Sequence, residues 1–481
     1  MIPFTIGQIA AITGGRPEDV ADLEAVVTGP VVVDSREAAP GGMFAALPGE
    51  RTDGHDFAAQ AVSSGAVVVL ATRSVEAPAI LVADVPAALA ALARALVDRL
   101  PELTIAGITG SAGKTTTKDL LAQLVATLGP TVAPQNSFNN EIGHPLTVLR
   151  ADEGTRYLIA ELSARGAGHI AALCQVAPPT YGAVLCVGNA HAGEFGTMEQ
   201  IAEAKSELPA ALPADGVALL NADDRLVAAM AGRTAARVVT FGRSDRADVR
   251  ASEVELDRLS RPRFTLTMPD GTARVELKLS GEHNVTNALA AAGLAGQLGM
   301  SVDTIGAGLS AAVPQSKWRM AITERADGVI VVNDAYNSSP EAVTAALAAV
   351  KVMAVGRRAY AVLGRMAELG ERSREFHEQA GVIAARTGLA GIIAVGDEAA
   401  PILTAAASEP GFIGELVAVP DDQSAIAAIN ERLKPGDVVL VKASRAAGLQ
   451  TVALALCKQA QQVRSPDFSP ENALTVQEGL E

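Results

Sequence analysis

The amino-acid sequence predicts an α/β protein of three domains, in which helices alternate with mostly parallel strands. Two observations favour this fold class. The chain has 481 residues, and at about 100–200 residues per domain this length indicates several domains. Short apolar runs alternate with alanine-rich helical segments, as in βαβ units, and hydrophobic residues make up 49% of the chain, enough to build large cores.

Residues 1–100 predict a small N-terminal α/β domain. Its expected elements are a short apolar strand with a polar end at 31–36, a helix followed by a strand over 58–71, and an alanine-rich helix over 86–100. Pro101 follows that helix and ends it, because proline lacks the amide hydrogen that a continuing helix needs.

Residues 101–313 predict a central domain built on a parallel sheet. A buried strand at 103–109 passes through a glycine-rich turn into a helix at about 114–128. Further apolar strands are expected at 156–162, 181–188, 216–221 and 236–242. An antiparallel hairpin is predicted where two runs of period two, at 264–268 and 275–279, are joined through Pro269-Asp270-Gly271.

Residues 314–464 predict a Rossmann-like C-terminal domain, because strands and helices alternate again. Its expected strands lie at 329–334, 360–364, 391–396 and 438–444. Residues 465–481 contain two prolines and several acidic residues. That composition is typical of a disordered tail.

Charge and composition exclude several classes of protein. The formal net charge is −15, which argues against a basic surface for nucleic acid. No apolar run reaches the roughly 18 residues that span a bilayer, and the first ten residues lack the basic start of a signal peptide. Cys174, Cys186 and Cys457 have neither metal-ligand nor disulfide spacing. We therefore expect a cytoplasmic protein without membrane insertion or a nucleic-acid partner.

The turn at residues 107–116, GITGSAGKTT, has the sequence of a phosphate loop. It lies between a strand and a helix, where backbone amides and the helix N-terminus can hold phosphate oxygens. Lys114 can reach the β and γ phosphates, and the Thr115 hydroxyl can hold Mg²⁺. The expected ATP-binding residues of the loop are Gly110, Ser111, Ala112, Gly113, Lys114, Thr115 and Thr116. The loop alone does not select among GTPases, kinases, motors and ligases.

Further motifs, in order along the chain, resemble those of the Mur ligase family from about residue 30 to residue 450. They are Asp34-Ser35-Arg36, Asp53-Gly54-His55, Ser137-Phe138-Asn139-Asn140, Gly281-Glu282-His283-Asn284 with Asn287, Asp334-Ala335-Tyr336-Asn337, and Leu363-Gly364 with Met366, Glu368 and Gly370. The fifth motif, with its tyrosine and asparagine, is similar to the corresponding motif in the branch of the family that adds a dipeptide.

The resemblance implies an ATP-dependent ligase that joins D-alanyl-D-alanine to UDP-N-acetylmuramoyl-tripeptide and so forms the pentapeptide precursor of peptidoglycan. It implies ATP and Mg²⁺ as cofactors, the tripeptide and the dipeptide as partners, and a monomer. A carboxylate would attack the γ phosphate to form an acyl phosphate, and an amine would then displace phosphate. Because an anion attacks a polyanion, charge neutralisation dominates this chemistry.

The resemblance also implies catalytic and metal-binding roles. With Lys114 on the phosphates, Thr115 and Glu161 would hold one magnesium ion and His191 a second. Lys205 would react as a neutral amine with CO₂, and its carbamate would bind the second magnesium ion. Arginine stays protonated and cannot react in this way.

The remaining site residues follow from the same motifs. Asn287 would contact the adenine edge, and Asn284 or His283 would shape its pocket. Asp334 would approach the ribose, and Arg319 would reach the phosphates. The expected substrate-binding residues are Ser35 and Arg36 for the uridine diphosphate part, Asn140, and Tyr336, Asn337, Lys442 and Ser444 near the dipeptide.

Three alternatives remain open. One is the branch that adds the third amino acid, although the third domain lacks an Asp-Asn-Pro-Arg motif. Another is a different Mur-related amide ligase, such as a folylpolyglutamate-type enzyme, although such enzymes lack the DSR motif found at 34–36. The last is a nucleotide-binding module without catalysis, against which the intact Lys114, Glu161, His191 and Lys205 argue.

Overall fold

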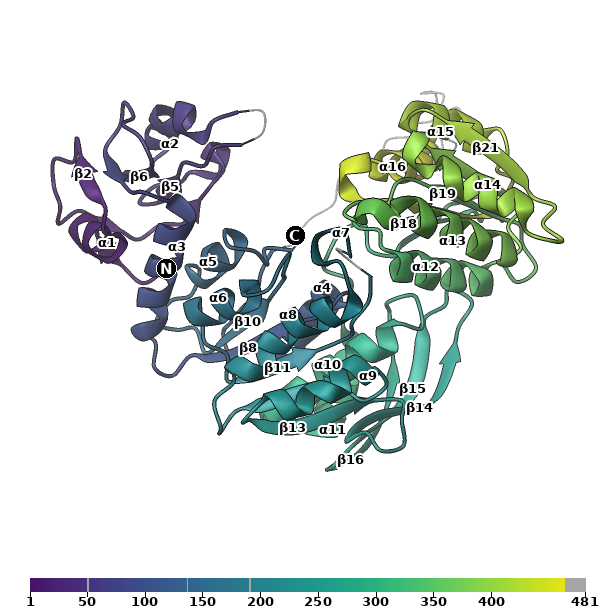
Figure 1. Cartoon of the computed structure of the whole chain (residues 1–481), viewed down its shortest axis with the longest axis horizontal. Helices are drawn as coiled ribbons and strands as arrows, with labels where there is room; N and C mark the ends of the chain where they lie inside the picture. The colour runs from purple at the N-terminus through teal and green to yellow at the C-terminus, as the bar shows by residue number, and fades with distance from the viewer. Residues whose placement is uncertain (50–51, 136, 190–191, 463–481) are drawn as a thin grey trace, which may run out of the picture. The chain divides into compact units, whose positions relative to one another are not determined.

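The structure, a computed structural model, describes residues 1–49, 52–135, 137–189 and 192–462. It confirms the predicted α/β class (Figure 1). The chain divides into two compact units. The first unit is Met1–Lys317 with Glu368–Arg372, and the second is Trp318–Ala367 with Ser373–Glu481. The tail predicted at 465–481 lies outside the described residues. Within those residues, no helix is both long and apolar enough to cross a membrane.

The N-terminal part of the first unit contains two small sheets. β1 (Phe4–Thr5) pairs with β3 (Val26–Val27), and a second sheet has the order β2-β7-β6-β5-β4. Its strands are β2 (Arg16–Glu18), β4 (Val31–Val32), β5 (Met43–Ala45), β6 (Val68–Ala71) and β7 (Ala79–Leu81), and its helical segments are α1 (Ile6–Thr13), η1 (Ser35–Glu37), η2 (Gly54–Phe57), α2 (Ala58–Ser63) and α3 (Val85–Asp98). Asp84 begins α3 as its cap, because its carboxylate accepts the Ala87 N–H at 2.6 Å.

A nine-stranded sheet in the order β16-β15-β14-β13-β12-β11-β8-β10-β9 forms the rest of the first unit. Its strands are β8 (Thr104–Thr109), β9 (Thr131–Val132), β10 (Tyr157–Glu161), β11 (Tyr181–Val184), β12 (Val217–Asn221), β13 (Arg237–Gly242), β14 (Val249–Leu256), β15 (Pro262–Met268) and β16 (Gly271–Glu276). The predicted hairpin is formed by β15 and β16. β16 begins earlier than expected because Met268 pairs directly with Gly271 across a two-residue turn.

Helices cover both faces of this sheet. α4 (Lys114–Val125), α10 (Asn284–Gln297) and α11 (Val302–Ala311) share one hydrophobic core with it, and α6 (His169–Val176) and α8 (Met198–Ala211) share another. Leu219 and Leu220, successive residues of β12, enter these two different cores. Both faces are therefore buried, which explains the continuous apolar runs of the strands. Shorter segments are α5 (Gly143–Val148), α7 (Ala192–Phe195), α9 (Arg225–Ala228) and η3 (Ala229–Arg233).

A further core joins the N-terminal part to the central sheet. It contains Leu92 and Leu96 of α3 together with Leu146 of α5 and Leu158 of β10. This shared core explains why residues 1–317 form one compact unit. The domain ranges that we inferred from the sequence therefore remain predictions.

The second unit contains a six-stranded sheet in the order β17-β18-β22-β19-β20-β21, parallel except for β17. Its strands are β17 (Ala321–Glu324), β18 (Ile330–Asp334), β19 (Ala359–Leu363), β20 (Gly391–Val395), β21 (Glu415–Val419) and β22 (Val438–Lys442). Its helical segments are α12 (Pro340–Met353), α13 (Ser373–Arg386), η5 (Asp397–Ala399), α14 (Ala400–Ser408), α15 (Asp422–Asn430), η6 (Arg445–Ala447) and α16 (Gln450–Gln462). This Rossmann-like arrangement brings the carboxyl ends of the parallel strands to one edge.

Candidate functional site

The turn between β8 and α4 is a phosphate loop tied to the end of the neighbouring strand β11. The Ser111 N–H donates to the Cys186 carbonyl at 2.9 Å, and the Ser111 hydroxyl donates to the Gly188 carbonyl at 3.0 Å. The Ala112 N–H lies 3.4 Å from Cys186 Sγ. Gly113 has a φ of 83°, a conformation that favours glycine. These contacts tie the loop to the segment that follows β11.

The helix that follows adds positive charge to the loop. Lys114 begins α4, and its ammonium group folds back to donate to the Gly110 carbonyl at 2.7 Å. The buried Thr115 hydroxyl lies 3.2 Å from the Ser137 hydroxyl, and Thr116 also belongs to the first turn of α4. Because the first turn of a helix leaves amide hydrogens unpaired, residues 110–116 can hold an anion.

Glu161 ends β10 beside β8, so it lies at the same edge of the sheet as the phosphate loop. Its side chain is buried, and Oε1 accepts a hydrogen bond from Asn139 Nδ2 at 2.7 Å. Among the described residues, no group donates to the buried Oε2. A buried carboxylate oxygen without a donor is costly unless a cation binds it. Glu161, with the Thr115 hydroxyl, therefore fits Mg²⁺, which commonly takes one or two protein ligands beside phosphates.

The contact with Asn139 is a feature that sequence reasoning missed. Asn139 belongs to the Ser137–Asn140 motif, but nothing in its spacing points to Glu161, which lies at the end of β10. Its neighbour Asn140, an expected substrate contact, accepts the Gly143 N–H at 2.9 Å and so helps to begin α5. The expected substrate contact of Asn140 stays a prediction.

Lys205 lies on α8 and is almost fully buried, with 3% of its surface exposed. Burial, and to a smaller extent the positive charge of Lys114, lowers the pKa of its amine to about 7. An ordinary lysine has a pKa near 10.4 and is protonated at neutral pH. The burial of Lys205 thus produces the neutral amine that reaction with CO₂ requires. His191, the other expected ligand of the second magnesium ion, lies outside the described residues.

Two asparagines of α10 lie directly behind the phosphate loop. Asn287 Nδ2 donates to Asn284 Oδ1 at 2.9 Å, and Asn284 Nδ2 donates to the Ser280 carbonyl at 2.9 Å. A side chain at Gly113 would overlap Asn287 Oδ1. The asparagines therefore leave room for the loop only if residue 113 is glycine, while their expected contacts with adenine stay predictions.

The expected uridine diphosphate contacts lie in η1 of the N-terminal part. Ser35 is buried and Arg36 is exposed. The Arg36 guanidinium donates to Asp34 at 2.5 Å, and this pairing lowers the pKa of the Asp34 carboxyl to about 2. Arg36 therefore occurs here in an ion pair with its own loop. The expected contact of Ser35 and Arg36 with a substrate stays a prediction.

Four expected residues of the second unit lie together at the carboxyl edge of its sheet. The buried Lys442 ammonium donates to Asp334 Oδ2 at 2.6 Å and to the Asn337 carbonyl at 2.9 Å. The other oxygen of Asp334 accepts the Met320 N–H at 3.0 Å. Ser444 is also buried, and its hydroxyl donates to a backbone carbonyl at 3.0 Å. Lys442 and Ser444 thus brace the loops at this edge.

Two guanidinium groups contact the ring of Tyr336 at the same edge. The Arg319 guanidinium lies 4.4 Å from the centre of its ring, and that of Arg445 lies 5.3 Å away. Arg445 also lies 5.5 Å from the ring of Trp318. All three distances lie within the range of a cation–π interaction. From the sequence, Tyr336 and the strand end that includes Arg445 were expected near the dipeptide, and Arg319 was expected to reach the phosphates; these roles stay predictions.

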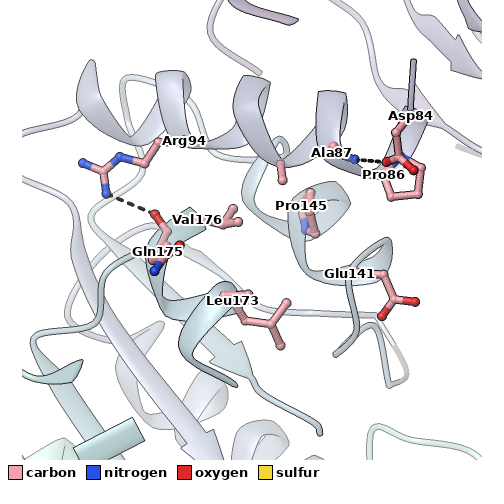
Figure 2. A pocket seen from close by; sticks show the side chains of 11 residues that line it. Asp84, Pro86, Ala87, Arg94, Glu141, Pro145, Leu173, Gln175 and Val176 are labelled. Atoms are coloured by element: carbon pink, nitrogen blue, oxygen red, sulfur yellow. Dashed lines mark hydrogen bonds between the residues drawn. The ribbon is translucent and has the colours of Figure 1, made fainter. Parts of the chain in front are cut away.

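A cavity of about 630 Å³ lies elsewhere in the first unit, between α3 and the helices α5 and α6 (Figure 2). Its walls are mostly apolar, with Arg94 and Glu141 among the lining residues. The guanidinium of Arg94 donates a hydrogen bond to the Gln175 carbonyl at 3.4 Å. None of the expected site residues lines the cavity, so it is separate from the candidate site.

Comparison with known proteins agrees with this geometry. Three models match the chain: the Mur ligase family catalytic domain at 30–110, the Mur ligase middle domain at 108–295, and the Mur ligase glutamate ligase domain at 318–445. The UDP-N-acetylmuramoyl-tripeptide–D-alanyl-D-alanine ligase of Mycobacterium tuberculosis (strain ATCC 25618 / H37Rv) is 49% identical and aligns over 95% of this chain and 98% of its own length.

Two solved structures are similar over nearly their whole length. MurF from Acinetobacter baumannii has a TM-score of 0.84 at 30% identity and covers 95% of this chain and 99% of its own. The MurF ligase from Thermotoga maritima in complex with ADP has a TM-score of 0.78 at 30% identity and covers 93% and 100%. The motifs, the two units and these full-length similarities lead to one conclusion: the chain belongs to the Mur ligase family.

Proposed function

We infer that this chain is an ATP-dependent ligase that joins D-alanyl-D-alanine to UDP-N-acetylmuramoyl-tripeptide and makes the pentapeptide precursor of peptidoglycan. The 49% identity over nearly the full length of a ligase with that name carries this inference. The phosphate loop and the buried Glu161 and Lys205 support it, because they supply the charges that the chemistry needs. The enzyme would act in the cytoplasm as a monomer.

The reaction consists of two substitutions. A carboxylate oxygen of the tripeptide attacks the γ phosphorus of ATP, the bond to the β-phosphate oxygen breaks, and ADP leaves. The neutral amine of the dipeptide then attacks the acyl carbon, the bond to the phosphate oxygen breaks, and phosphate leaves while the nitrogen loses a proton to solvent. Lys114 and the loop amides neutralise the anionic oxygens during the first substitution.

Glu161 and Thr115 are the groups of this chain that would hold Mg²⁺. The bound ion would neutralise the β and γ phosphate oxygens. Asn139 positions the Glu161 carboxylate by donating to Oε1, which leaves Oε2 for the cation. Second-shell contacts of this kind orient the ligands of many metal sites.

Lys205 would supply a further anionic ligand. Its neutral Nζ attacks the carbon of CO₂, an N–C bond forms, and a proton leaves to water, which gives a carbamate. The pKa of about 7 supports this step, because the amine need not first lose a proton at high pH. The carbamate and His191 would together hold the second magnesium ion.

The decisive experiment measures ATP-dependent phosphate release by the purified protein with UDP-N-acetylmuramoyl-tripeptide, adding D-alanyl-D-alanine or single amino acids in parallel. We expect release with the dipeptide alone. Release with a single amino acid on the shorter precursor would instead assign the chain to the branch that adds the third residue. Absence of release in both cases would refute the proposal.

A further inference from the structure

Cationic side chains gather at the carboxyl edge of the sheet in the second unit, where ligands of open α/β sheets bind. Lys442 ends β22, and Arg445 follows three residues later. Lys442 is not available to an incoming anion. Its side chain is 1% exposed, and it is paired with Asp334 at 2.6 Å. Releasing it would leave the partly buried Asp334 without its partner, at a cost that exceeds most single contacts.

Arg445 differs from Lys442 in every one of these respects. It is exposed, and among the described residues none forms an ion pair or a hydrogen bond with its guanidinium. The group is instead held over the rings of Trp318 at 5.5 Å and Tyr336 at 5.3 Å. A ring contact takes up no N–H group in an ion pair, so the guanidinium can still bind a planar carboxylate through two parallel hydrogen bonds.

From this arrangement we propose that Arg445 binds the C-terminal carboxylate of the incoming dipeptide and makes the enzyme specific for a free acid. The proposal rests on the proposed function, in which the dipeptide reacts through its amine. The dipeptide has one anionic group, its carboxylate, and this group must be held away from the reacting nitrogen. Arg445 is a binding residue in this role, while Lys442 and Ser444 brace the loops around it.

The test compares two substrates and four proteins. The substrates are D-alanyl-D-alanine and D-alanyl-D-alaninamide, in which a neutral amide replaces the C-terminal carboxylate. The proteins are the wild type, Arg445→Gln, Arg445→Lys, and the matched control Arg365→Gln. Arg365 lies after the adjacent strand β19, but its guanidinium is paired with Glu398 at 2.8 Å. Phosphate release gives kcat/KM for each pair.

The wild type should prefer the acid over the amide by about 10- to 100-fold in kcat/KM, the range expected for a charge-assisted hydrogen-bonded pair. Arg445→Gln should lose that preference by lowering kcat/KM for the acid and leaving the value for the amide unchanged. Arg365→Gln should keep the preference. Arg445→Lys should retain part of it, because the charge remains and the fork is lost.

Two results would overturn the proposal. Equal kcat/KM values for the acid and the amide in the wild type would show that no group recognises the carboxylate. An equal loss for both substrates in Arg445→Gln would show that Arg445 acts only through its stacking on Trp318 and Tyr336. Absence of phosphate release by the wild type with either substrate is a different result, because it would refute the proposed function itself and this proposal with it.

Discussion

Replacing Lys205 with arginine should abolish the capture of CO₂ at this position and, with it, turnover. A carbamate forms only on a neutral amine, and a guanidinium stays protonated at any pH at which the protein is folded. The exposed Lys351 of α12 provides a matched control, since Lys351→Arg makes the same substitution at an ordinary, solvent-exposed helical lysine. We expect Lys351→Arg to retain both capture and turnover.

The expected size of the effect follows from the buried position of Lys205. With a pKa of about 7, roughly three-quarters of the amines are neutral at pH 7.5, whereas an ordinary lysine with a pKa near 10.4 has about one neutral amine in a thousand. The buried site therefore raises the reactive fraction several hundred-fold. Between pH 5.5 and 6.5 the neutral fraction rises about eightfold, and between pH 7.5 and 8.5 it rises by less than half.

The assay uses two measurements. ¹³C NMR detects the carbamate in protein equilibrated with ¹³C-labelled CO₂, and a second experiment measures the initial rate of label incorporation at a fixed concentration of dissolved CO₂. The wild type should show a carbamate signal whose rate of appearance levels off above about pH 7. Lys205→Arg should lack the signal. A rate that keeps rising about tenfold per pH unit beyond pH 8 would refute the reasoning, as would a signal that persists in Lys205→Arg.

Three further predictions follow from buried polar groups. Burial lowers the pKa of His144 to about 4, so the unfolded chain binds a proton as pH falls below about 6.5 while the folded chain does not. The free energy of unfolding should then drop by about 2 kcal/mol between pH 7.5 and 5, and urea titrations of His144→Gln should lack this component. Asn139→Ala should weaken Mg²⁺-dependent turnover about 10- to 100-fold, because Glu161 loses the donor that orients it. Higher Mg²⁺ should restore part of that activity, and a loss that Mg²⁺ does not relieve would contradict the assignment. Lys442→Met should destabilise the protein by about 3 kcal/mol in thermal unfolding, because Asp334 keeps a charge without a partner. Adding Asp334→Asn should recover much of that stability, and a single variant as stable as the wild type would refute the account.

Local features of the fold were predictable because local sequence decides them. The alternation of apolar strands and amphipathic helices identified the α/β class, and the glycines and Lys114 between a strand and a helix identified the phosphate loop. The hairpin of β15 and β16 was also expected, but its register was not. Register depends on which residues pair across the turn, and here Met268 pairs with Gly271.

Contacts between residues far apart in the sequence were not predictable in the same way. Glu161 was identified by its motif, yet its tie to Asn139 depends on how the segment after the phosphate loop returns to β10. Lys442 and Asp334 are separated by 108 residues, and they meet because β18 and β22 are adjacent in the sheet. The sequence suggested Lys442 as a substrate contact, which stays a prediction, and only the structure shows its buried ion pair with Asp334.

By itself, the sequence determined the types of residue that this protein can use: a lysine and threonines after a glycine turn, an acid at a strand end, and a lysine where arginine could not serve. Tertiary structure alone decided their chemical state. Burial of Lys205 in α8 lowers its pKa, and the Arg445 guanidinium lies over the rings of Trp318 and Tyr336. Desolvation and the direction of a side chain depend on the packing of distant elements, which residue order does not specify.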